Sequence, residues 1–153
     1  MGSEMCIRDR YINDVENFKN KTFPIGQKNF ILRQKKSPSS KESLLHRLAY
    51  HDFYLLNKYI DINDVKVKKY KESKNYLLVV FFTKNRFFKF IYDIKSKVQK
   101  HEINKTNMMK YQKDPLEKMI KFVFNCKKRE IIENCSNSLF ASRLISIINK
   151  KFY

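Results

Sequence analysis

The sequence predicts an α+β fold, with one mainly antiparallel sheet of four or more strands and helices packed on one face. Two observations support this class. Short alternating or continuous apolar segments, typical of strands, lie at 27–34 and throughout 64–103. Segments with apolar residues three and four positions apart, typical of amphipathic helices, lie on either side of 64–103. Strands grouped together in this way indicate α+β rather than a strict α/β alternation.

Five strands are expected from β-branched and aromatic content, at 27–34, 65–70, 76–82, 86–92 and 97–103. The connection at 83–85 is short enough for an antiparallel hairpin between the third and fourth of these strands. The join at 94–96 is similarly short, so we expect a meander in which each strand pairs with the next.

Three helices are expected, at about 41–59, 115–126 and 137–150. Ser40 or Ser43 is the expected N-cap of the first, because a serine hydroxyl accepts a hydrogen bond from a free backbone N–H. Asp114 and Pro115 begin the second, since aspartate caps and proline loses no bond in the first turn. The third carries an apolar stripe at Leu139, Phe140, Leu144, Ile147 and Ile148.

The length and composition fit one domain. The 153 residues are enough for a real core, and 42% of them are hydrophobic and 14% aromatic, which excludes a disordered chain. No apolar run approaches the roughly 20 residues of a membrane helix, so no membrane contact is expected. Cys6, Cys126 and Cys135 form no CxxC pair, which argues against a zinc site or disulfide framework and favours a cytoplasmic location.

The net charge of +18 suggests contact with polyanions, but its origin weakens that inference. Lysine far outnumbers arginine, and Asn, Ile, Phe and Tyr are common. A+T-rich codons favour these residues, so base composition alone explains much of the charge. A dedicated phosphate-binding surface more often uses arginine, whose guanidinium binds two oxygens at once. The charge therefore predicts non-specific, salt-sensitive polyanion binding.

The first ten residues, MGSEMCIRDR, share neither the period nor the composition of the rest. We expect residues 1–10 to be a disordered or non-native tail, because SEMCIRDR resembles a translated sequencing-adapter scar. If these residues are non-native, this sequence would be a C-terminal fragment of a longer protein. Residues 11–153 are expected to form a single α+β domain.

One histidine interrupts the apolar stripe of the first helix, which consists of Leu44, Leu48, His51, Leu55 and Tyr59. An imidazole there is either a hydrogen-bonded core group or a functional group facing a cavity, and the sequence leaves both open. His46 lies about 140° around the helix from His51, so no metal site is expected. Glycine occurs only at positions 2 and 26, which excludes a phosphate-binding loop and a complete nucleotide-dependent enzyme.

The order of segments and three stretches of sequence resemble the C-terminal domain of the Gfo/Idh/MocA oxidoreductases, which are sugar and cyclitol dehydrogenases. The stretches are LAYHDFYLLNKYI at 48–60, DPLEKMIKFVFNC at 114–126 and NCSNSLFASRLISIINK at 134–150. The resemblance covers roughly residues 23–152. It implies that the first helix carries a substrate site.

His51 matches the family's catalytic histidine, which takes part in proton transfer from a substrate hydroxyl. The family usually has an aspartate one turn earlier, whereas this chain has Arg47, which cannot accept a proton. Tyr54 stands where a second aspartate often follows. Arg47 and Tyr54, together with Arg33, are therefore expected to bind an acidic or phosphorylated sugar-like substrate.

The family's nucleotide-binding half is a separate Rossmann domain. The resemblance therefore implies no cofactor in this chain, and NAD or NADP in a full-length parent. It implies a substrate-binding and oligomerisation domain, inactive alone, that forms a homo-oligomer such as a dimer through its open sheet face. The alternative is a basic, non-enzymatic module that binds nucleic acid or another polyanion. Exposed aromatics alternating with lysines around 87–92 on an uncovered sheet would favour the alternative.

Because the chain has no glycine-rich turn, we expect no measurable affinity for NAD(H) or NADP(H) and no dehydrogenase activity. Titrating the purified chain into reduced cofactor and following nicotinamide fluorescence measures this. A complete dehydrogenase of known affinity serves as the positive control. Saturable micromolar binding would contradict the fragment hypothesis.

Overall fold

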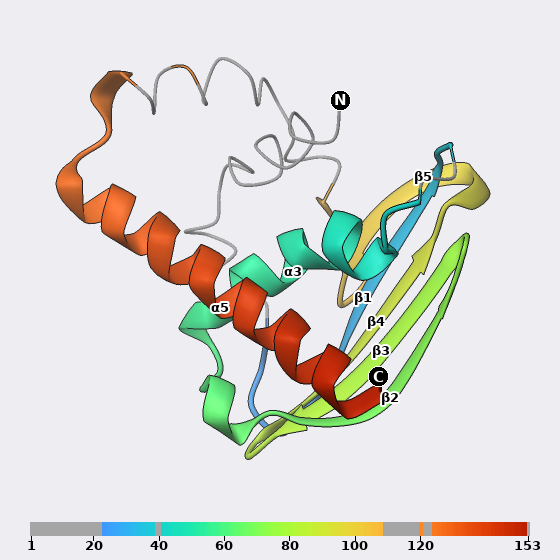
Figure 1. The fold of residues 1–153 in the computed structure, drawn as a ribbon, viewed down its shortest axis with the longest axis horizontal. Helices are drawn as coiled ribbons and strands as arrows, with labels where there is room; N and C mark the ends of the chain where they lie inside the picture. Colours follow the sequence, from blue (N-terminus) through green and yellow to red (C-terminus); the bar gives the residue numbers. More distant parts are fainter. Residues whose placement is uncertain (1–22, 39–40, 109–119, 121–123, 153) are drawn as a thin grey trace.

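The structure, a computed structural model, describes residues 23–38, 41–108, 120 and 124–152. Its strands are β1 (Lys28–Lys36), β2 (Lys66–Ser73), β3 (Tyr76–Thr83), β4 (Arg86–Asp93), β5 (Lys95–Ile103) and β6 (Thr106–Asn107). They form one sheet in the order β2-β3-β4-β1-β5-β6. The helices lie on one side of this sheet (Figure 1), which confirms the expected α+β class.

The expected meander forms only in part. β2, β3 and β4 pair in antiparallel order, and the hairpin turns between Thr83 and Arg86 as expected. β5, however, does not pair with β4, because β1 lies between them, parallel to β4 and antiparallel to β5. Ile94 joins β4 to β5 past the end of β1, where its carbonyl accepts a hydrogen bond from the N–H of Ser37 at 3.0 Å. β1, which is distant in the sequence, thus takes the place beside β4 that was expected for β5.

The first expected helix is one irregular segment made of η1 (Leu45–Ala49), α3 (Tyr50–Tyr54) and η2 (Leu55–Lys58). Its turns change from π to α to 3-10 along the chain. The Ser43 hydroxyl accepts a hydrogen bond from the N–H of Leu45 at 3.1 Å, so Ser43 caps the first turn, whereas Ser40 lies outside the described residues. Glu72 of β2 accepts hydrogen bonds from Ser43 and from the N–H of Leu44, which ties this turn to the sheet.

The last helix, α5 (Lys128–Phe152), includes the expected 137–150 and begins earlier. Glu130 accepts a hydrogen bond from the N–H of Lys127 at 2.7 Å and so satisfies a backbone group at this earlier start. The buried apolar residues of α5 are Phe140, Ala141, Leu144, Ile145 and Ile148. The expected helix at 115–126 and the tail at 1–10 fall mostly or wholly outside the described residues. No helix in the described part of the chain is both long and apolar enough to cross a membrane.

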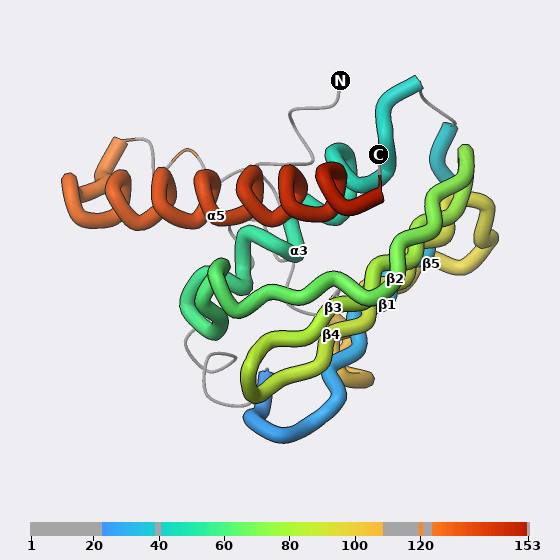
Figure 2. The backbone as a smooth tube through the Cα atoms, turned by 60° about the horizontal axis from the view of Figure 1, so that its bottom comes forward, coloured from blue at the N-terminus to red at the C-terminus, as the bar shows by residue number. Residues whose placement is uncertain are grey.

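The core lies between the sheet and the helices (Figure 2). The rings of Phe81, Phe88 and Phe90 stack across β3 and β4, with centroids 5.1, 5.5 and 6.2 Å apart. Phe53 of α3 meets this stack edge-on, 5.1 Å from Phe90. Such aromatic pairs add about 0.5–1.5 kcal/mol each beyond the burial of their area. The stack therefore holds α3 over the middle of the sheet.

Candidate functional site

The helical segment around α3 faces the core in a different register from the expected one. Its residues that are at most 2% exposed are Leu44, Leu45, Leu48, Ala49, Asp52, Phe53 and Leu56. Leu55 and Tyr59, which belonged to the expected stripe, are only partly buried. The core-facing stripe is thus turned by about one residue, or 100° of helix. Asp52, rather than His51, occupies the middle of the stripe.

Three side chains from three adjacent strands hold the Asp52 carboxylate. Arg33 of β1 donates from Nε to Oδ2 and from Nη2 to Oδ1, both at 2.9 Å. The Tyr92 hydroxyl of β4 donates to Oδ2 at 2.7 Å, and Nε2 of His101 in β5 lies 3.1 Å from Oδ1. The strand register places Tyr92, Arg33 and His101 side by side. We call these four residues the Asp52 cluster; it joins α3 to the three middle strands.

The Asp52 cluster is a buried ion pair rather than an open site. Burial alone would raise the pKa of Asp52, but the Arg33 guanidinium, and then His101, hold this pKa well below its usual range. An ionised carboxylate can only accept, so Nε2 of His101 is the donor in their hydrogen bond. Each of the four side chains belongs to a residue at most 8% exposed, which leaves a substrate no access to the carboxylate.

The arginine and tyrosine residues expected to bind substrate make separate structural contacts. Arg33 belongs to the Asp52 cluster and is buried, and its expected role in substrate binding stays a prediction. Arg47 donates to the Ser37 hydroxyl at 3.1 Å. The buried Tyr54 donates its hydroxyl hydrogen to Oδ1 of Asn134 in α5. These contacts tie the helical segment to its neighbours, and they do not converge on one cleft.

His51 is 5% exposed, and its ring meets that of Tyr50 edge-on at 5.8 Å. Of the two alternatives that the sequence left open for His51, its burial favours a core group over one that faces a cavity. A catalytic role for His51 in a longer parent stays a prediction. Sequence reasoning overlooked Asp52, although its spacing of four from both Leu48 and Leu56 was a usable signal.

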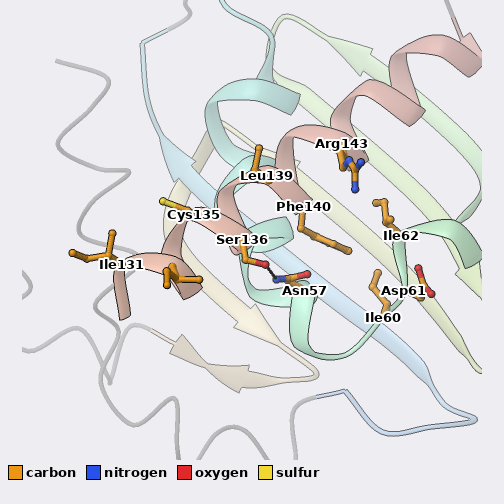
Figure 3. A pocket seen from close by; sticks show the side chains of 11 residues that line it. Asn57, Ile60, Asp61, Ile62, Ile131, Cys135, Ser136, Leu139, Phe140 and Arg143 are labelled. Carbon is orange, nitrogen blue, oxygen red and sulfur yellow. Dashed lines mark hydrogen bonds between the residues drawn. The ribbon is translucent and has the colours of Figure 1, made fainter. Parts of the chain in front are cut away.

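A cavity of about 530 Å³ lies between α5 and residues 57–62. Figure 3 shows Phe140 pointing across it toward Ile60 and Ile62, and the amide of Asn57 donates to the Ser136 hydroxyl at 3.1 Å on one side. None of the residues expected from the sequence to bind substrate lines this cavity. Among the described residues, no three His, Cys, Asp or Glu side chains are grouped to hold a metal ion.

The outer face of the sheet, which points away from the helices, carries two rows of aromatic and lysine side chains. Because neighbouring residues of a strand point to opposite faces, the buried Phe81 and Phe88 place Phe82 and Phe87 on the outer face. Strand register gives the first row as Lys66, Phe82, Phe87 and Lys28. It gives the second row as Lys69, Val80, Lys89 and Phe30. We call these the aromatic–lysine rows; neither contains a carboxylate.

Comparisons of the chain with protein-family models, curated proteins and solved structures found no match. The resemblance to the Gfo/Idh/MocA C-terminal domain therefore stays a prediction. The geometry of the described residues has to carry the functional argument. Of the surfaces described, the aromatic–lysine rows combine side chains that recognise a definite chemistry.

We expect Asp52→Asn to lower the free energy of unfolding by about 3–5 kcal/mol, because it leaves the buried Arg33 charge without its counter-charge. Tyr92→Phe should cost about 1.5–3 kcal/mol, since it removes one hydrogen bond to a charged group. Tyr76→Phe, on the outer face, is the matched control and should change stability by less than about 0.5 kcal/mol. Urea denaturation followed by circular dichroism measures all three. Equal losses for Tyr92→Phe and Tyr76→Phe would contradict the structural role of the cluster.

The low pKa of Asp52 also predicts how stability depends on pH. Below about pH 4, the ordinary range of a carboxyl group, the unfolded chain binds a proton that the folded chain does not. The stability contributed by Asp52 is therefore present at neutral pH and declines as the pH falls below about 4. The difference between the wild-type protein and Asp52→Asn should shrink between pH 7 and pH 3 in urea denaturation. A difference that stays constant across this range would show that Asp52 is not the ionised partner.

Proposed function

We propose that this chain is a non-enzymatic module that binds nucleic acid on the outer face of its sheet. The observation that carries the proposal is the arrangement of the aromatic–lysine rows. Phenylalanine rings lie between lysines on a sheet face that none of the described helices covers. Lysines supply the charge that phosphates need, and aromatic rings supply flat surfaces on which bases stack.

The lysines of these rows are available to a ligand. Lys28, Lys66 and Lys69 are exposed, and Lys89 is half-buried between Val80 and Phe30. An additional exposed lysine, Lys68, places Nζ 5.6 Å from the centroid of the Phe82 ring. Several ammonium groups on one face bind polyanions by releasing condensed counterions. The position of the lysines, rather than the total charge of the chain, supports this function.

A second copy of the chain is the other occupant that an apolar sheet face suggests, and the predicted homo-oligomer would use the same face. Charge argues against it. Face-to-face pairing would bring the lysines of both aromatic–lysine rows against those of the partner with no carboxylate in either row to offset them. Like charges brought together in an interface cost several kcal/mol. A phosphate backbone has the opposite charge and meets no such penalty.

The predicted oxidoreductase domain has less support from the described residues. His51 is enclosed, and Arg33 is bound to Asp52. Neither group can reach a sugar hydroxyl without repacking the core. The prediction of a substrate-side domain would regain support from a glycine-rich βαβ unit in sequence upstream of this chain.

Replacing outer-face lysines should weaken nucleic-acid binding. Lys66→Gln combined with Lys69→Gln removes two phosphate contacts and should lower the slope of log K against log salt by about 1.4 for a single strand. The matched control is Lys128→Gln combined with Lys150→Gln. It removes the same amount of charge, but from α5, which lies on the opposite side of the sheet. Fluorescence anisotropy with a labelled oligonucleotide at several salt concentrations measures both. Equal effects of the two pairs, or no saturable binding by the wild type, would overturn the proposal.

A further inference from the structure

We infer that the ligand of the outer face is a single-stranded nucleic acid whose unpaired bases stack on Phe30, Phe82 and Phe87. This inference rests on the proposed function and narrows it to one class of nucleic acid. It also places the binding site at one end of the sheet face.

The three rings form one continuous aromatic surface across three strands. The Phe82 and Phe87 centroids are 5.0 Å apart with an angle of 71° between the rings, and the Phe30 and Phe87 centroids are 6.3 Å apart at 60°. Phe30 is 45% exposed, which is unusual for so large an apolar side chain. The rings support one another but leave ring surface open to a ligand. Every base has a flat apolar face, so such a surface binds bases with little regard to sequence.

Lysines surround this aromatic surface where a sugar–phosphate backbone would pass. Lys66 and Lys28 stand at the two ends of the row that contains Phe82 and Phe87. Lys89 is directly beside Phe30 in the next row. A strand whose bases lie on the rings therefore meets an ammonium group on each side. Stacking and phosphate contact can take place together, as binding of a single strand requires.

A duplex would bind this surface much less tightly than a single strand. Its bases are already stacked on one another and lie inside the double helix, so they cannot reach the rings without unpairing. The rings of Phe30 and Phe87 lie on the face of a sheet and do not project as an element that enters a groove. A duplex would contact the lysines only. We therefore expect the single strand to bind more tightly than a duplex of the same length.

The next row of the outer face carries no aromatic ring. The row beyond Val80 and Lys89 consists of Lys71, Leu78, Ile91, Leu32 and Glu102. Aliphatic side chains offer no flat ring, and Glu102 repels phosphate. The site therefore ends at the aromatic–lysine rows.

Phe30→Leu keeps an apolar side chain at the site and removes the flat ring. Its matched control is Phe124→Leu, because Phe124 is 82% exposed and lies outside the sheet. Each protein is titrated against a labelled oligothymidylate of about 20 nucleotides, its duplex with oligoadenylate, and heparin. We expect Phe30→Leu to weaken oligothymidylate binding about tenfold, with the salt slope and the affinities for duplex and heparin unchanged. Phe124→Leu should bind all three probes as the wild type does.

Other outcomes separate the two proposals. Equal affinity of the wild type for single strand, duplex and heparin, with no effect of Phe30→Leu, would overturn base stacking and leave polyanion binding on the sheet in place. No saturable binding of any probe would overturn both. A wild type that sediments as a dimer, and becomes a monomer in Phe30→Leu, would also overturn both, because it would show that a second copy occupies the face. Melting temperatures of the two variants, measured in parallel, show whether both are folded.

Discussion

The rest of the structure depends on the ion pair between Arg33 and Asp52. It forms in the core, where a charge without a partner would cost several kcal/mol, so α3 and β1 hold each other in a single arrangement. Tyr92 and His101 extend the contact to the strands on both sides of β1. A strand inserted between two others has no turn to set its register, and here a bidentate ion pair does so instead.

The register of β1 in turn decides what the outer face presents. With Arg33 directed inward, Phe30 and Leu32 point outward, and Phe30 lies beside Lys89 of β4. A slip by one residue would reverse the two faces, exposing Arg33 and burying the site residues of β1. The buried cluster thus has an effect on function without touching a ligand. It fixes the position of a ring on the opposite side of the sheet.

Local patterns in the sequence were sufficient for the fold class, the hairpin at Thr83–Arg86 and most of the strands, because period and turn length are properties of neighbouring residues. They were insufficient for the place of β1, which depends on pairing with residues far along the chain. They were also insufficient to predict the Asp52 cluster. An imidazole within an apolar stripe drew attention to His51, whereas the carboxylate one position later had an oppositely charged partner, Arg33, in a distant strand. A buried charge is explained only once its partner is known.

The same non-local pairing changes the meaning of the chain's positive charge. Lysines spread along an A+T-biased sequence say little about function by themselves. Insertion of β1 beside β4 brings Lys28 and Phe30 next to Phe87 and Lys89, so that charge and aromatic surface from two separate segments share one face. Each segment alone supplies one ring and one ammonium group to this face, and only the paired strands place ammonium groups on both sides of the rings. The proposed site is therefore a product of the sheet order, and it exists only in the folded chain.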